Sequence, residues 1–269
     1  MSKQVIRQKY LIHVFTNKQL GLNGNPCSVV ILDQNISSEE MQAIATQEDQ
    51  PATAFLHLKK DLHYKVRWFA PDEEIVLCGH GAAAGIYALS VFLSTEKLIS
   101  LENKEGIVIK GSRSGNGCEF TMPAIPHHQA SSPPKGLEEA LGKKIKSYFK
   151  TDNKDLVLLE SEGAVKEMVP DFDKLRQIDV FGYSITAPSK DDQKDFVSRT
   201  LVPHVQQLED HATGSSHSIL FPFWSKRMNK NKLTAIQLSK RGGYFEASVE
   251  KEKVHFHINC ELVELAELN

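Results

Sequence analysis

The stretch that decides the fold occurs twice in the chain. Residues 67–71 read RWFAP and are followed, after six further residues, by Cys78; residues 199–203 read RTLVP and are followed, after the same interval, by Asp210. Each copy has the pattern of a strand, a proline turn, a short apolar approach, a polar residue and a glycine-containing turn before a helix. Two copies at an offset of 132 residues predict a duplicated domain with pseudo-twofold symmetry rather than a solenoid.

Each copy ends in a helix N-terminus, and this has a chemical consequence. Gly79-His80-Gly81 opens the first helix and Gly214-Ser215 opens the second. The backbone N–H groups of a first helical turn and the helix dipole favour the binding of an anion such as a carboxylate. If the two turns lie across a cleft, Cys78 and Asp210 at equivalent positions act on opposite faces of a bound molecule. That layout suits the removal of a proton from one face and its return on the other.

The rest of the chain has the patterns of a mixed α and β protein. A segment with three prolines, residues 125–135, predicts the link between an N-terminal lobe, 1–125, and a C-terminal lobe, 126–269. The return of the last residues to the first lobe is an open alternative. The patterns predict helices at 38–47, 82–93, 137–141, 171–177 and 216–226, and strands at 9–15, 27–32, 54–58, 64–69, 98–101, 106–110, 118–122, 156–160, 178–185, 197–202, 233–239, 244–249 and 253–258.

The composition favours a soluble enzyme or binding protein. The 269 residues are 41% hydrophobic and 25% charged, with a net charge of -2, so a sizeable core is expected and a nucleic-acid partner is not. The short basic run at 226–232 is expected to be a solvated loop. The first ten residues have no secretory pattern and no apolar stretch has the length of a membrane helix. We therefore expect a cytoplasmic protein without a membrane partner.

The cysteines and histidines give no metal signature. Cys27, Cys78, Cys118 and Cys260 form no C-x-x-C pair, and reduced thiols are expected in the cytoplasm. The alternating pair at residues 255 and 257 could bind a metal only with Cys260 as a third ligand. Exposed strand histidines, with no metal, are the preferred interpretation.

Four blocks in order give the chain a resemblance to a known family. They are VFT at 14–16 with GNPCSVV at 24–30, the segment 67–80, EDHATGSSH at 209–217, and QLSKRGG at 237–243. The chain is identified on these blocks as similar to the phenazine-biosynthesis isomerase-like proteins. That family shares its fold with diaminopimelate epimerase, and the resemblance covers nearly the whole chain.

The resemblance implies an α+β fold of two pseudo-symmetric lobes, each a mostly antiparallel, curled sheet around a central helix. It also implies an isomerase or epimerase that moves a proton on a small carboxylic acid without a cofactor; characterised members act on a dihydro-hydroxyanthranilate. His80 and Asp210 match the proton-handling positions, and Cys78 is a third catalytic candidate. A small carboxylate-bearing substrate and a second copy of the chain in a homodimer are the expected partners. The candidate substrate-binding residues are Asn25, Gly79, Gly81, Thr213, Gly214 and Ser215.

One departure affects the chemistry. The family's main acid/base is a glutamate in a segment like S-E-T-x-F, and the matching residue here is Ala52, which cannot transfer a proton. Glu48 and Asp49 lie close by, but at the end of a helix we expect them to face solvent. The proline of the family's E-D-P is replaced by His211. A non-catalytic protein that binds small carboxylates is therefore the alternative function.

The candidate residues also have plainer interpretations. Cys78 is either a thiol acid/base or a buried structural thiol. Asp210 could be a simple N-cap, and His80 and Ser215 could cap or pack their helices. His217, inside the second helix, is expected to be a packing residue. The sequence contains neither a G-x-G-x-x-G motif nor a P-loop, so a nucleotide ligand is not expected.

Overall fold

The computed structural model describes residues 6–266, and it divides the chain into two compact units. Unit 1 contains residues 6–18, 23–121 and 257–266; unit 2 contains residues 19–22 and 122–256. A short 3-10 helix, Lys18–Leu20, lies where the chain first passes between them. The sequence predicts a boundary after residue 125, whereas in the structure the chain passes from unit 1 to unit 2 after residue 121. The last ten described residues, 257–266, belong to unit 1.

Unit 1 is built on a sheet that closes on itself. Its strands are β1 (Ile6–Val14), β2 (Asn25–Leu32), β3 (Thr53–Lys60), β4 (His63–Phe69), β5 (Glu74–Ile75), β6 (Ile99–Glu102), β7 (Val108–Ser114), β8 (Gly117–Pro123) and β17 (Lys253–Ala266). The pairs β2–β3 and β4–β6 are parallel, whereas β1–β2, β3–β4, β6–β7 and β7–β8 are antiparallel. The sheet closes because β17 pairs with both β8 and β1.

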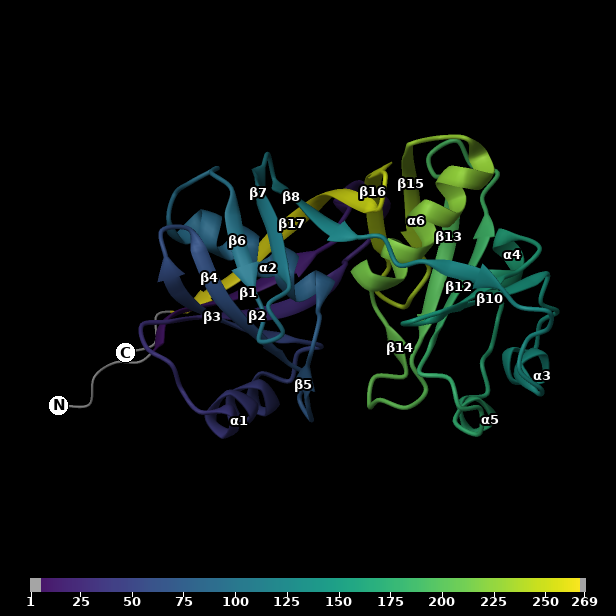
Figure 1. The fold of residues 1–269 in the computed structure, drawn as a ribbon, viewed down its shortest axis with the longest axis horizontal. Coiled ribbons are helices and arrows are strands. Elements are labelled where there is room, and N and C mark those ends of the chain that lie inside the picture. Colours follow the sequence, from purple (N-terminus) through teal and green to yellow (C-terminus); the bar gives the residue numbers. More distant parts are fainter. Residues whose placement is uncertain (1–5, 267–269) are drawn as a thin grey trace. The chain divides into compact units, whose positions relative to one another are not determined.

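A helix runs through the inside of this sheet. Helix α2 (Gly79–Phe92) is buried from Gly79 to Ser90, and Figure 1 shows it surrounded by the strands of unit 1. Small residues allow this fit: a Cβ added at Gly85 would lie 3.3 Å from a methyl of Leu101. Helix α1 (Ser38–Glu48) covers the outer face, where Met41 and Ala45 pack against β2, β3 and β4.

Unit 2 repeats this plan. Its strands are β9 (His127–Gln129), β10 (Ser147–Thr151), β11 (Asp155–Leu158), β12 (Tyr183–Pro188), β13 (Phe196–Leu201), β14 (Glu209–Asp210), β15 (Lys232–Gln237) and β16 (Gly243–Glu250). Its helices are α3 (Leu137–Leu141), α4 (Glu162–Lys166), α5 (Phe172–Leu175) and the long, largely buried α6 (Gly214–Met228). The expected link at 125–135 contains β9, which pairs with β10, so it is partly a strand rather than a plain connection.

The strand pairings confirm the duplication and the α+β fold. The parallel pairs β11–β12 and β13–β15 repeat β2–β3 and β4–β6, and the antiparallel pairs β12–β13 and β15–β16 repeat β3–β4 and β6–β7. Each unit is thus a curled, mostly antiparallel sheet with one long buried helix, α2 or α6. The sequence repeat reflects a repeat of structure.

The register corrects one expectation drawn from the repeat. Phe69 pairs with Glu74 and the equivalent Leu201 pairs with Glu209, so three extra residues lie between the proline turn and the short strand of unit 2. Asp210 therefore corresponds to Ile75 and not to Cys78. The residue that corresponds to Cys78 is Thr213: both are N-caps, with φ/ψ of -124°/104° and -119°/104°.

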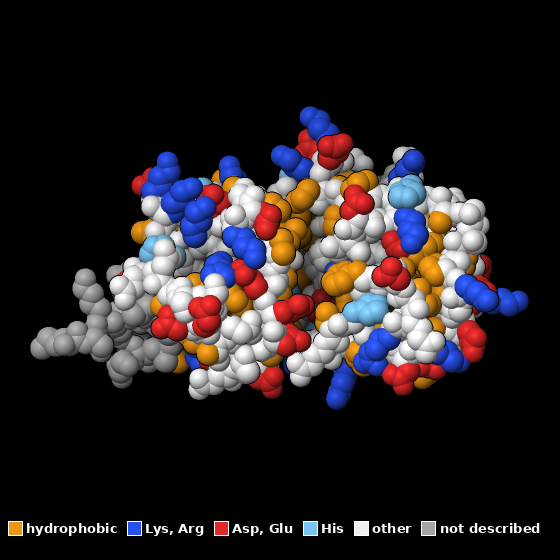
Figure 2. Space-filling model, turned by 60° about the horizontal axis from the view of Figure 1, so that its bottom comes forward, with side chains coloured by type: hydrophobic (Ala, Val, Ile, Leu, Met, Phe, Trp, Pro, Cys, Tyr) orange, Lys and Arg blue, Asp and Glu red, His pale blue; other side chains and the backbone are white. Residues whose placement is uncertain are grey.

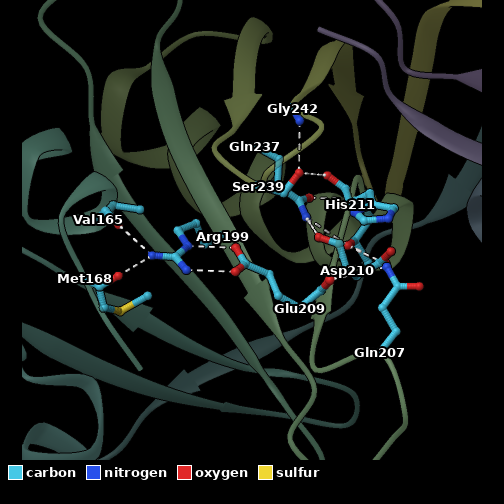
Figure 3. A network of polar contacts seen from close by, with 11 residues as sticks. Val165, Met168, Arg199, Gln207, Glu209, Asp210, His211, Gln237, Ser239 and Gly242 are labelled. Atoms are coloured by element: carbon cyan, nitrogen blue, oxygen red, sulfur yellow. Dashed lines mark hydrogen bonds and ion pairs between the residues drawn. The ribbon is translucent and has the colours of Figure 1, made fainter. Parts of the chain in front are cut away.

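The repeated arginines have a structural role. Arg67 donates from Nε and Nη2 to the two carboxylate oxygens of Glu74, both at 2.9 Å. Arg199 makes the same two-pronged contact with Glu209, both at 2.7 Å, and also donates to the carbonyl oxygen of Met168 at 2.6 Å (Figure 3). Each pair ties a short strand, β5 or β14, to the long strand before it.

The surface agrees with the near-neutral charge. On the face shown in Figure 2, Lys and Arg side chains are interspersed with Asp and Glu rather than gathered into one basic patch. Among the described residues, no helix combines the length and the apolar character needed to cross a membrane.

His217 is a packing residue, as the sequence suggested. Its ring lies 3.5 Å, centroid to centroid, from the ring of Phe245 and is fully buried. Nδ1 lies 2.9 Å from the carbonyl oxygen of Thr213, so Nδ1 carries the proton, and Nε2 accepts from Ser198 Oγ at 3.3 Å. Burial lowers the pKa of His217 to about 3, although the bond to Thr213 opposes this.

This burial predicts a pH-dependent stability. Between pH 6.5 and 3 the unfolded chain protonates His217 whereas the folded chain does not, so its stabilising contribution is complete above pH 6.5 and falls as the pH drops. We expect the advantage of the native protein over H217Q in free energy of unfolding to shrink by about 2 kcal/mol between pH 7.5 and 5. Urea unfolding at several pH values measures this. The exposed His128→Gln is the control, and a gap in stability that stays constant for H217Q contradicts the assignment.

Candidate functional site

The start of α2 brings a thiol and an imidazole together. Cys78 Sγ lies 3.3 Å from His80 Nδ1, and the N–H of Gly81 donates to the same sulfur at 3.3 Å. Both side chains are buried, with 5% and 7% of their surface exposed. A thiol within hydrogen-bond reach of an imidazole at a helix N-terminus can release and regain a proton. Cys78 is thus a cap, and its geometry also suits acid/base chemistry.

Trp68 packs directly against this turn. A Cβ at position 81 would lie 2.5 Å from Trp68 Cδ1, 2.8 Å from its Nε1 and 3.1 Å from Cys78 Sγ, so only glycine fits. Trp68 is 1% exposed, and its Nε1 has no hydrogen-bond partner within the described part of the chain. The close packing of Trp68 therefore explains why position 81 is a glycine, and the sequence pattern did not reveal this contact.

Strand β2 of unit 1 carries two further buried polar or ionisable residues, Asn25 and Cys27. Asn25 is its first residue and is fully buried, and Cys27 is two positions further on, so alternation places both on one face of the strand. Burial raises the pKa of the Cys27 thiol well above its ordinary value, and the neighbouring Cys78 raises it further. Cys27 therefore stays a neutral thiol.

Ala52, the residue that the sequence resemblance matches to the family's glutamate, is a buried methyl group. Ala52 is fully buried immediately before β3, and its carbonyl oxygen accepts from the N–H of Ser28. Glu48 does not face solvent as expected: its carboxylate accepts from Lys9 Nζ at 2.7 Å and from Ser28 Oγ at 2.8 Å. Asp49, by contrast, is exposed.

Glu48 also lies on the wrong face to replace a carboxylate at position 52. The α1 side of the sheet carries Phe55, and alternation along β3 gives Ala52 the face opposite to Phe55. Glu48 belongs to α1 and is bound on that helix's side of the sheet.

In unit 2, a network holds Asp210 at the approach to α6 (Figure 3). Asp210 Oδ2 accepts from Thr213 Oγ1 at 2.6 Å. Gln237 accepts from the N–H of Thr213 at 2.9 Å and donates to the carbonyl oxygen of Asp210 at 2.7 Å. Thr213, not Asp210, is the N-cap, so the plain-cap interpretation of Asp210 is wrong. Its carboxylate is instead oriented by a hydroxyl group.

The late QLSKRGG block supports the same segment. Ser239 Oγ donates to the carbonyl oxygen of His211 at 2.6 Å and accepts from the N–H of Gly242 at 3.1 Å (Figure 3). Gly242 has φ of +69°, which favours glycine. Burial lowers the pKa of His211. Gln237 and Ser239 are supporting residues that the block signalled, but their partners could not be identified from sequence.

The first turn of α6 holds a contact that sequence reasoning missed. Ser215 is the second residue of the helix, and its Oγ accepts from Lys154 Nζ at 3.1 Å. Lys154 is only 7% exposed. Ser215 is thus not the cap of α6, and Gly214, the first helical residue, lies between it and Thr213.

The histidine and cysteine side chains of the last strand form no metal centre in the described residues, where no three His, Cys, Asp or Glu side chains could hold an ion. His257 lies 3.2 Å from Glu119, and His255 lies 3.9 Å from Glu250. Cys260 Sγ lies 3.9 Å from Cys118 Sγ.

Fold and site together define a class of protein: two similar units, each with ionisable side chains at or just before the start of its buried helix. A solved hydroxyproline epimerase from Agrobacterium vitis has this fold, with a TM-score of 0.61 at 12% identity over 100% of this chain and 94% of its own. A family model described as phenazine biosynthesis-like protein matches residues 12–265. The chain belongs to this family.

Two relatives are much more similar. An uncharacterized isomerase of Halalkalibacterium halodurans is 35% identical over 249 residues, which cover 91% of this chain and 92% of the relative. The crystal structure of a phenazine biosynthesis family protein from Enterococcus faecalis has a TM-score of 0.88 at 30% identity, with 98% of this chain and 99% of the other covered. These matches confirm the family resemblance.

The contact between Gly81 and Trp68 gives a prediction on stability. Gly81→Ala should lower the free energy of unfolding by about 1–3 kcal/mol, because the new methyl group overlaps the indole. Gly163→Ala in α4 is the matched control: its Cβ would meet nothing closer than 3.8 Å, so stability should be unchanged or slightly raised. Chemical denaturation of both variants measures the difference. Equal stabilities would show that the indole moves aside without cost.

Proposed function

We propose that the protein is a cofactor-independent isomerase or epimerase that moves a proton on a small carboxylic acid. The observation that carries the proposal is that each unit has ionisable side chains at or just before the start of its buried helix. In unit 1 these are the Cys78–His80 pair at 3.3 Å, and in unit 2 it is Asp210, oriented by Thr213 at 2.6 Å.

In this proposal unit 1 exchanges a proton through sulfur and imidazole. The N–H of Gly81 and the N-terminal end of the α2 dipole both stabilise a thiolate on Cys78, and His80 can accept the thiol proton. Burial excludes bulk water from the pair, which strengthens each of these interactions. His80 and Cys78 would then act together as acid and base.

Unit 2 would supply the second acid/base and a grip on the carboxylate. The hydroxyl group of Thr213 donates to Asp210 Oδ2 and so orients the carboxylate. Gln237 fixes the backbone by bonding the carbonyl oxygen of Asp210 and the N–H of Thr213. Gly214 and Ser215 in the first turn of α6 would hold the carboxylate with backbone N–H groups and a hydroxyl. Gly79, Gly81 and Asn25 are the corresponding proposed contacts in unit 1.

The relatives support this class of reaction. Several curated relatives at 35–36% identity are named isomerases, and the family resemblance points to acids like dihydro-hydroxyanthranilate. The hydroxyproline epimerase from Agrobacterium vitis was solved with bound trans-4-hydroxy-L-proline, which makes this compound a second useful probe. Both compounds are small and carry a carboxylate.

A second function, non-catalytic binding of small carboxylates, is favoured by one observation. Ala52 places a methyl group where the family's glutamate is expected, and Glu48 is held on the other face of the sheet by Lys9 and Ser28. A protein that kept the anion-binding turns but lost the main base would bind its ligand without turning it over.

Proton exchange with solvent distinguishes the two functions. In D₂O the protein should catalyse deuterium incorporation into a responsive acid from a panel that includes dihydro-hydroxyanthranilate and trans-4-hydroxy-L-proline. Mass spectrometry measures the mass increase. D210N should slow the incorporation about 100-fold or more, because general acid/base groups contribute on this scale.

The control is D173N, whose carboxylate lies on the surface beside Arg176 and should leave the rate unchanged. C78A and H80Q should each slow exchange if the pair acts as one unit. Normal exchange by D210N would refute the role of Asp210. Binding of an acid without any exchange by the native protein would establish the non-catalytic function instead.

A further inference from the structure

Thr213 is the N-cap of α6, yet its side chain does not cap the helix. Threonine hydroxyls at this position usually accept a hydrogen bond from the first helical turn, and within the described chain Thr213 accepts none from α6. Its counterpart in unit 1 does so, because Cys78 Sγ accepts from the N–H of Gly81 at 3.3 Å. The Thr213 hydroxyl donates instead to Asp210 Oδ2 at 2.6 Å. It therefore serves the carboxylate rather than the helix.

Two backbone groups fix the orientation of the Gln237 side-chain amide. Gln237 is fully buried at the end of β15. Its Oε1 accepts from the N–H of Thr213 at 2.9 Å, and its Nε2 donates to the carbonyl oxygen of Asp210 at 2.7 Å (Figure 3). A backbone N–H only donates and a backbone carbonyl only accepts, so a flipped amide would lose both bonds. The positions of Oε1 and Nε2 are thus determined.

The second hydrogen of this amide fixes the direction of the next bond. Gln237 Nε2 lies 3.2 Å from Thr213 Oγ1, and an amide nitrogen cannot accept a hydrogen bond. Thr213 Oγ1 is therefore the acceptor, and the one hydrogen of its hydroxyl group is left for Asp210 Oδ2. The hydrogen bonds run in a single direction, from Gln237 through Thr213 to Asp210.

This direction selects one form of the carboxyl group. A hydrogen bond donated to a carboxylate favours the charged form over the protonated form. A proton on Asp210 Oδ2 would also face the hydroxyl hydrogen of Thr213, and that hydrogen would lose its acceptor. The chain of bonds therefore favours an ionised Asp210, which is the form that a general base requires.

Unit 1 has the same support but not the same chain of bonds. The registers of the parallel pairs β4–β6 and β13–β15 make Asn103 the counterpart of Gln237. Asn103 Nδ2 donates to the carbonyl oxygen of Val76 at 2.9 Å, ahead of α2, as Gln237 does ahead of α6. Its Oδ1 accepts from backbone N–H groups of its own turn. Support of the chain before the buried helix is thus common to both units, and the added bond to an N-cap hydroxyl belongs to unit 2.

We propose that Gln237 is a positioning residue for Asp210: through Thr213 it directs a hydroxyl hydrogen to the carboxylate and so holds Asp210 in the ionised form. The proposal rests on the proposed function for the role of Asp210 in proton transfer. It gives unit 2 a base held in its reactive form, in a chain where Ala52 matches the family's glutamate. It also explains why a glutamine opens the QLSKRGG block.

The test follows the Asp210 carboxyl group with pH. Carbon NMR of the full chain, labelled at its aspartate carboxyl carbons and assigned with D210N, gives the pH at which this group takes up a proton. T213V removes the donor and Q237M removes its orientation. In each variant this pH should rise by about one unit, which is a tenfold change in proton affinity. T213S keeps the hydroxyl group and should remain close to the native protein.

Ser239→Ala is the matched control. Ser239 Oγ donates to the carbonyl oxygen of His211, so its loss loosens the same turn while the bonds of Asp210 to Thr213 and Gln237 remain. The native pH value is expected for this variant. The ionisable groups around this segment are unchanged in all the variants, so their effect is common to them: Glu209, His211, Lys240 and Arg241. Circular dichroism and thermal unfolding identify the folded variants, and T213V tests the chain of bonds if Q237M does not fold.

Each outcome decides the proposal. An upward shift in T213V and in folded Q237M, with T213S and S239A like the native protein, supports it. No shift in T213V overturns it, and so does an equal shift in S239A, which would make the effect a loosening of the turn. A shift in T213V without one in folded Q237M removes the role from Gln237. The titration needs no substrate, so the isomerase function can fail while the role of Gln237 stands, and the reverse.

Discussion

The bidentate pairing of an arginine with a glutamate is the interaction on which the approach to each buried helix, α2 and α6, depends. Arg67 binds Glu74 and Arg199 binds Glu209 through two parallel hydrogen bonds each. Both ion pairs are partly buried, where such charge-assisted bonds are strong and where loss of one partner leaves a charge uncompensated. These ion pairs fix the short strands β5 and β14, which directly precede the buried helices α2 and α6 in the chain.

The same scaffold carries different chemistry in its two copies. Three pairs of equivalent positions differ in their functional groups: Cys78 and Thr213, His80 and Ser215, and Cys27 and Lys154. At these positions the first unit thus has two thiols and an imidazole, and the second has two hydroxyl groups and an ammonium group. Duplication preserved the backbone geometry, while the side chains at the helix starts diverged.

Much of this organisation could be predicted from sequence, because glycine turns and apolar periodicity are local signals. The repeat, the long helices α2 and α6 and the packing role of His217 all followed from such signals. The predicted equivalence of Cys78 and Asp210 in the repeat was wrong, because unit 2 has three extra residues after Pro203 and nothing in the sequence marks this insertion. Only the hydrogen-bond register reveals them.

Lys154 was missed for a different reason. The strand before it, β10, reads SYFKT and was not predicted, so the segment looked like an ordinary charged loop. Burial of a lysine depends on tertiary neighbours such as Gly182 and Ser215, which are remote in sequence. The same holds for Gln237 and Ser239, whose side chains act on a turn 24 to 28 residues away.

The closure of unit 1 by β17 has a consequence for the order of folding during synthesis. The strand that joins β8 to β1 includes residues 257–266, which are synthesised after all of unit 2. Unit 2 uses β9, made early, in the corresponding place beside β10. Residues 122–256 can therefore assemble while the sheet begun by residues 6–121 still has an open edge. The half of the chain that is made first is the half that is finished last.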